Sequence, residues 1–137
     1  MLDAPHPPER VWPVVSDLST YPRWLDIVPR ADLAADGSWT VDLRGSLGPF
    51  ARTKRLRMIR TTAAPQELAV FERSELDGRQ HSPWVLRAEL EPVGDDGSRL
   101  TMRLHYGGSL FGPVLERLLG DTIERSRPRL LALLEEA

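Results

Sequence analysis

The feature that most constrains the fold is a long central stretch, from about residue 28 to residue 106, in which apolar and polar residues alternate. A period of two is typical of β-strands with one face buried and the other in water. The clearest alternating runs are Trp39–Arg44, Trp84–Glu91 and Leu100–Tyr106. Two further strands, at about Leu68–Ser74 and at the basic segment Arg52–Arg60, alternate less cleanly.

The breaks between these runs carry turn residues, namely Asp36-Gly37, Asp77-Gly78 and Gly94-Asp95-Asp96-Gly97. Such pairs favour tight hairpin turns because glycine adopts backbone angles that other residues avoid. Short connections between alternating runs indicate antiparallel strands. The sequence therefore predicts a meander of about six strands.

Helical patterns flank the predicted sheet. The first runs from about Pro8 to Asp17, where Pro8 suits the first turn of a helix. Pro13 lies inside this pattern and predicts a short or kinked helix, since proline removes a backbone hydrogen bond. A second short helical turn is expected from Thr20 to Leu25.

A long helix is predicted from Pro113 to the C-terminus. Its apolar residues recur with helical spacing and end in a leucine stripe, which we expect to pack on the sheet. Gly120 and Pro128 interrupt the pattern and predict a bend near Glu124.

Composition excludes several classes of protein. A chain of 137 residues that is 41% hydrophobic predicts one folded domain over residues 1–137 rather than a disordered segment. It has no apolar run of about 20 residues for a membrane span and no signal-peptide pattern, so we expect a cytoplasmic protein. The chain lacks cysteine, and its three histidines, His6, His81 and His105, are dispersed, so no metal site or cofactor is predicted.

The charge balance argues against a general nucleic-acid-binding surface. Lysine and arginine total 18 against 20 acidic residues, which gives a net charge of −2. One basic cluster stands out within this balance: Arg52, Lys54, Arg55, Arg57 and Arg60.

Several short motifs, in this order, resemble the polyketide cyclase/dehydrase-like proteins of the START/Bet v 1-like superfamily. They are Asp3-Ala4-Pro5, Pro8–Trp12, Val15-Ser16-Asp17, Tyr21–Trp24, Trp84 with Leu86, Arg99-Leu100-Thr101 and Tyr106-Gly107-Gly108. The resemblance implies an α+β helix-grip fold, in which a curved antiparallel sheet of about six strands wraps a long C-terminal helix, with two short N-terminal helices. It also implies a hydrophobic cavity between the sheet and that helix.

One departure from the family concerns its first strand. Only Met1 and Leu2 precede the Asp3-Ala4-Pro5 motif. Either this strand is nearly absent or the natural chain starts further upstream. A missing strand would expose a sheet edge, which favours a homodimer.

The resemblance predicts a protein that binds an apolar small molecule such as a lipid, a quinone or a polyketide. The side chains expected to line the cavity are Trp24, Trp39, Phe71, Trp84, Tyr106, Leu118 and Thr122. Aromatic residues at these positions also suit a plain hydrophobic core, because core and cavity wall form one surface in this fold.

The first alternative is an enzyme, a polyketide cyclase or dehydratase. Enzymes of the superfamily typically place an arginine and hydroxyl groups in the cavity to orient a ketone chain and stabilise an enolate. The candidates are Arg55, Arg57, Thr53 and Tyr106. This alternative requires Arg55 or Arg57 to point inward. The sequence does not decide which face of strand 52–60 lines the cavity, and a solvated outer face carrying these arginines is the competing interpretation.

The second alternative is an interaction module like the coenzyme Q-binding and ribosome-associating toxin branch of the superfamily. In that case the basic segment Arg52–Arg60 would contact RNA or a protein partner in a salt-sensitive way. The net charge of −2 argues against it.

Overall fold

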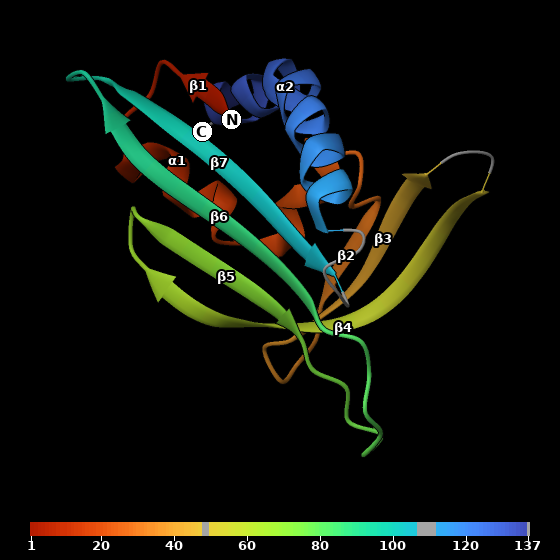
Figure 1. Ribbon diagram of the computed structural model, residues 1–137. Helices are drawn as coiled ribbons and strands as arrows, with labels where there is room; N and C mark the ends of the chain where they lie inside the picture. The colour runs from red at the N-terminus through yellow and green to blue at the C-terminus, as the bar shows by residue number, and fades with distance from the viewer. Residues whose placement is uncertain (48–49, 107–111, 137) are drawn as a thin grey trace.

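A computed structural model of the chain shows a curved antiparallel sheet with helices on its concave side (Figure 1). It describes residues 1–47, 50–106 and 112–136, the side chains of 45–47, 50–52, 106 and 112–119 excepted. The elements in chain order are β1 (Leu2–Ala4), α1 (Pro8–Val15), the 3-10 helix η1 (Leu18–Arg23), β2 (Arg30–Leu33), β3 (Trp39–Leu47), β4 (Phe50–Ala64), β5 (Leu68–Arg73), β6 (Trp84–Val93), β7 (Gly97–Tyr106) and α2 (Gly112–Glu136).

The described strands form one sheet in the order β1-β7-β6-β5-β4-β3-β2, and every neighbouring pair is antiparallel. From β2 to β7 each strand therefore lies beside the next one in sequence, which confirms the predicted meander. The sequence predicted about six strands and the sheet has seven. One of the shortest is β1, whose three residues pair with Ser98–Leu100 of β7. The first strand is thus short but present, and it covers part of the β7 edge.

The turns follow the signals in the sequence. Gly37 and Gly78 have positive φ angles of 87° and 71°, which glycine adopts without steric cost. The aspartate before each glycine accepts a hydrogen bond from a backbone N–H two residues further on, at Ser38 and Arg79.

Helix α1 is shorter than the sequence pattern suggested, and η1 begins and ends two residues before the predicted Thr20–Leu25 turn. Helix α1 begins at Pro8, as predicted, and ends at Val15 rather than at Asp17. The Asp17 carboxylate accepts a hydrogen bond of 2.9 Å from the backbone N–H of Ser19 and so caps the start of η1. Since a capping residue has non-helical backbone angles, helix α1 cannot continue through Asp17, where η1 begins.

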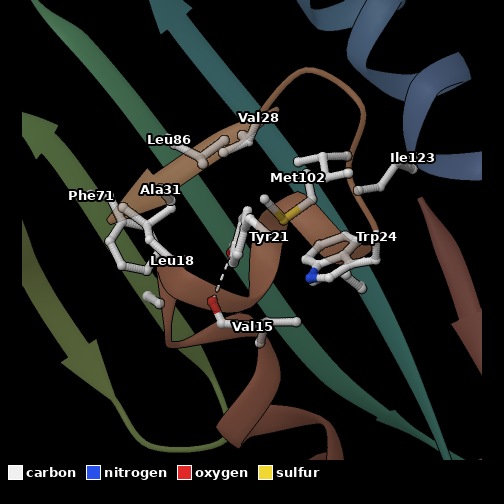
Figure 2. Close-up of a cluster of buried hydrophobic side chains, with 14 of the residues drawn as sticks. Val15, Leu18, Tyr21, Trp24, Val28, Ala31, Phe71, Leu86, Met102 and Ile123 are labelled. Carbon is white, nitrogen blue, oxygen red and sulfur yellow. Dashed lines mark hydrogen bonds between the residues drawn. The ribbon is translucent and has the colours of Figure 1, made fainter. Parts of the chain in front are cut away.

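Side chains of η1 occupy the middle of the concave face (Figure 2). Tyr21 and Trp24 are fully buried, with their ring centroids 4.7 Å apart. Tyr21 also meets Phe71 of β5 edge-on at 6.0 Å, and Phe71 in turn meets Trp39 of β3 at 5.7 Å. This aromatic cluster joins η1 to the sheet and forms the centre of the core.

Helix α2 crosses the concave face and is continuous through both Gly120 and Pro128. Its buried described residues recur every three or four positions, as expected for one face of a helix: Thr122, Ile123, Ser126, Leu130 and Leu134. None of the helices in the described part of the chain is long and apolar enough to cross a membrane.

Candidate ligand-binding site

The register of the sheet assigns each strand residue to one of two faces. Residues paired directly across antiparallel strands point to the same side. The inner face, toward the helices, carries Trp39, Val41, Leu43, Lys54, Leu56, Met58, Phe71, Arg73, Trp84, Leu86, Leu100, Met102 and Leu104. Most of these side chains are apolar and buried, so the inner face provides the apolar surface expected of this fold.

Strand β4 turns its predicted catalytic residues away from the helices. Leu56 and Met58 are buried on the inner face, so Thr53, Arg55 and Arg57 lie on the outer one. The sequence did not decide which face of β4 these residues occupy, and the structure places them on the outer face. This corrects the expectation that Arg55 or Arg57 could serve a reaction in the interior.

Both arginines are engaged on that outer face. The Arg55 guanidinium donates to Asp42 of β3 at 2.9 Å, and this hydrogen bond lowers the pKa of the Asp42 carboxyl. Arg57 donates to the Asp36 carboxylate at 3.1 Å and to the carbonyl oxygen of Ser74 at 2.7 Å. These contacts hold the two side chains along the sheet surface.

Three of the predicted aromatic lining residues belong to the packed core. Trp24, Trp39 and Phe71 are 0%, 6% and 0% exposed. The indole N–H of Trp24 donates to the hydroxyl of Thr20 at 3.4 Å, and that of Trp39 to the hydroxyl of Ser19 at 3.0 Å. Trp39 and Phe71 contact each other, and Tyr21 links Phe71 to Trp24, so the three predicted residues belong to one aromatic cluster.

Trp84, the first residue of β6, differs from Trp24 and Trp39 because it is only half-buried. The ammonium of Lys54 lies 5.8 Å from the centroid of its ring, within the range of a cation–π contact. Thr122 is buried on α2. The side chains of Tyr106 and Leu118 lie outside the described residues, although the Tyr106 backbone pairs with Trp84.

The sequence interpretation missed an arginine on the inner face. Arg73 is paired directly with Met58 and follows Phe71 by two positions, so all three share that face. Its side chain is only 10% exposed, and its Nε donates to the Glu75 carboxylate at 3.1 Å. The Glu75 carboxylate also accepts a hydrogen bond from the backbone N–H of Arg57. A signal for Arg73 was present, because it continues the inward alternation of Ala69 and Phe71.

Potential metal ligands do not gather anywhere in the described part of the chain, where no three His, Cys, Asp or Glu side chains lie together as a metal site would require. The described inner face offers apolar contact, with positive charge at Lys54, Arg60 and Arg73.

The chain matches no curated protein sequence significantly. Among solved structures it is similar to a START superfamily protein from Mycobacterium smegmatis, with 17% identity over 98% of this chain and 94% of that chain and a TM-score of 0.66. A protein from Deinococcus radiodurans shares 18% identity over 96% and 95%, with a TM-score of 0.67. A conserved protein from Geobacillus kaustophilus shares 14% over 98% and 92%, with a TM-score of 0.69.

At these identities the likeness concerns the fold, and it confirms the START-like helix-grip architecture. The family itself follows from a match along nearly the whole sequence. The family model described as polyketide cyclase/dehydrase and lipid transport matches residues 3–135. The chain belongs to this polyketide cyclase/dehydrase and lipid transport family.

Proposed function

We propose that the protein binds an apolar small molecule, of the lipid, quinone or polyketide class, between its sheet and helix α2. The observation that carries this proposal is the contrast between the two faces of the sheet. The inner face is mostly apolar, whereas the outer face carries arginine–carboxylate pairs such as Arg55–Asp42 and Arg87–Glu89. Membership of a family described by cyclase and lipid-transport functions supports the same proposal.

The ligand would lie at the end of the concave face nearest the β3–β4 hairpin. The middle of that face is filled by Tyr21 of η1 and by Trp24, which follows that helix. Beyond them the inner face continues with Leu43, Lys54 and Trp84. Trp84 and Lys54 are only partly buried, which suits a position at the rim of the site.

An enzymatic function is the second candidate, and Arg73 is the observation that favours it. A cyclase or dehydratase acting on a poly-β-ketone needs positive charge beside the developing enolate. Arg55 and Arg57 lie on the outer face, so Arg73 would take that role. The RNA-binding alternative gains no such support, because the outer arginines of β4 that the structure describes are paired with Asp42 and Asp36.

Native mass spectrometry of protein purified without added ligand tests the proposal. A denaturing run on the same sample identifies whatever is released. We expect a bound mass in the range of a lipid, a quinone or a polyketide. Protein that is free of ligand, and that also fails to take up compounds of all three classes when they are added, would contradict the proposal.

A further inference from the structure

The acidic side chains of the strands are confined to one face of the sheet. Every acidic residue within a strand lies on the outer face: Asp3, Asp32, Asp42, Glu72, Glu89 and Glu91. The described inner-face residues of the same strands include three cations, Lys54, Arg60 and Arg73. The Arg60 guanidinium donates to the carbonyl oxygen of Ser16 at 2.8 Å, so this residue stabilises the end of α1. The two other cations lie elsewhere on the face.

Lys54 contacts Trp84, and Arg73 is next to Trp84 by the register of the two strands. The ammonium of Lys54 stands over the indole ring. In the β5–β6 register Phe71 faces Leu86 and Glu72 faces Val85, so the next step along these strands brings Arg73 beside Trp84. One end of the inner face therefore combines two cations with an aromatic ring that is half-buried.

The guanidinium of Arg73 is oriented by two hydrogen bonds. Its Nε donates to Glu75 and its Nη1 to the carbonyl oxygen of Ser82 at 3.4 Å. Glu75 is itself held by the backbone N–H of Arg57 at 3.0 Å. A guanidinium offers five donors in a fixed plane, and its remaining donors suit a planar or tetrahedral anion.

We infer that the bound molecule is an anionic amphiphile, whose carboxylate or phosphate group interacts with Lys54 and Arg73 while its apolar body lies along the inner face. This inference rests on the proposed function and names the ligand class. An anion that leaves water for this partly buried site would be stabilised by the Lys54 ammonium and by the Arg73 donors that Glu75 does not use, whereas a cationic head group would be repelled by Lys54.

Four compounds with the same 12-carbon chain test the inference: dodecanoate, dodecyl phosphate, dodecanol and dodecylamine. Their dissociation constants are measured by isothermal titration calorimetry below the micelle concentration. We expect at least one anion to bind about tenfold more tightly than the alcohol, the gain typical of a charge-assisted hydrogen bond, and the amine to bind most weakly. The ratio between the two anions distinguishes a carboxylate from a phosphate ligand.

Adjacent residues of β4 provide matched variants. Lys54→Gln removes an inward cation, and Arg55→Gln removes an outward one. We expect Lys54→Gln to reduce anion affinity about tenfold while dodecanol affinity stays unchanged, and Arg55→Gln to change neither. Arg73→Gln should act like Lys54→Gln, and retained dodecanol binding in each variant verifies that it is folded.

The outcomes separate the inference from the proposed function. Equal affinity of the anions and the alcohol, or loss of anion affinity in Arg55→Gln alone, would overturn the inference and leave apolar ligand binding intact. Failure of all four compounds to bind would overturn the inference and the lipid class of the proposed function, whereas the proposed function as a whole falls only if quinones and polyketides also fail to bind.

Discussion

The phenolic hydroxyl of Tyr21 donates a hydrogen bond of 2.7 Å to the backbone carbonyl oxygen of Val15, and both residues are fully buried. This contact joins the middle of η1 to the end of α1 (Figure 2). Burial, with a smaller contribution from the nearby Asp17 carboxylate, raises the pKa of the Tyr21 phenol far above its ordinary value. The hydroxyl therefore remains protonated, and so remains a donor, above the pH at which an exposed phenol ionises.

Tyr21→Phe removes the hydroxyl and leaves the Val15 carbonyl oxygen buried without this donor. We expect the free energy of unfolding to fall by about 1–2 kcal/mol, the usual cost of such a loss. Urea denaturation followed by tryptophan fluorescence measures the change. An unchanged unfolding midpoint would mean that the hydrogen bond contributes nothing to stability.

The same phenol predicts an alkaline limit to stability. Because folding raises the pKa of this phenol, the unfolded chain loses the Tyr21 proton near the ordinary tyrosine pKa of 10.0 while the native protein retains it. Stability is fully present below pH 10 and falls above it, with a contribution of about 1.4 kcal/mol per pH unit from this group. Urea denaturation between pH 8 and pH 11 should therefore show a shallower decline in Tyr21→Phe, and parallel curves would refute the prediction.

Asp36 should make the stability of the folded protein depend on pH in the acid range. Three hydrogen bonds lower the pKa of the Asp36 carboxyl to about 2. In order of decreasing effect, their donors are the Ser38 hydroxyl, the Ser38 backbone N–H and the Arg57 guanidinium. The stability that this aspartate contributes is thus present above its unfolded pKa and is lost as pH falls toward 2. Carboxyl-carbon NMR titration should give Asp36 a low value in the wild type and a higher one in Ser38→Ala. Identical titrations in the two proteins would show that the Ser38 hydroxyl is not the main cause.

Two glycines should respond to alanine in opposite directions. A Cβ on Gly97 would lie 2.7 Å from the carbonyl oxygen of Val93, so Gly97→Ala must displace the β6–β7 turn and should cost about 1–3 kcal/mol. A Cβ on Gly120 meets nothing within 4 Å, and Gly120→Ala should stabilise α2 by about 0.5–1 kcal/mol. Thermal unfolding measures the midpoint temperature of both variants. A shift of both midpoints in one direction would contradict the packing described at Gly97 and Gly120.

Phe71 should behave as a core residue. It is fully buried between Tyr21 and Trp39, so Phe71→Ala should destabilise the protein by about 3–5 kcal/mol. Val85→Ala, on the outer face of the neighbouring strand, is the control and should cost much less. Equal losses of stability in the two variants would place Phe71 outside the core.

Much of the fold could be predicted because the local signals agree with the tertiary arrangement. The alternation of Trp39–Arg44, the turn at Asp36-Gly37 and the position of Pro8 each matched the observed element. The first strand was harder to predict, because three residues are too few to show a period of two. Its pairing with β7 depends on a partner almost 100 residues away along the sequence.

The face of β4 could not be assigned from that strand alone, because both of its faces carry charge. The neighbouring strand holds the missing information. Pairing symmetric about the Gly48-Pro49 dipeptide of the sequence places Leu43 opposite Lys54 and Val41 opposite Leu56, which is the observed register. Since Trp39, Val41 and Leu43 form the apolar side of β3, this symmetry would have turned Lys54 inward and Arg55 outward.

Methyl NMR of the protein with isotope-labelled leucine and valine, titrated with dodecanoate, tests the central claim most directly. If the ligand is held inside, at the end of the sheet near Lys54 and Trp84, the methyl signals of Leu43, Leu56 and Leu104 should shift. The signal of Val85, on the outer face, should not. Shifts confined to Val85 and other outer-face methyls, or no shifts at all, would contradict a ligand site between the sheet and α2.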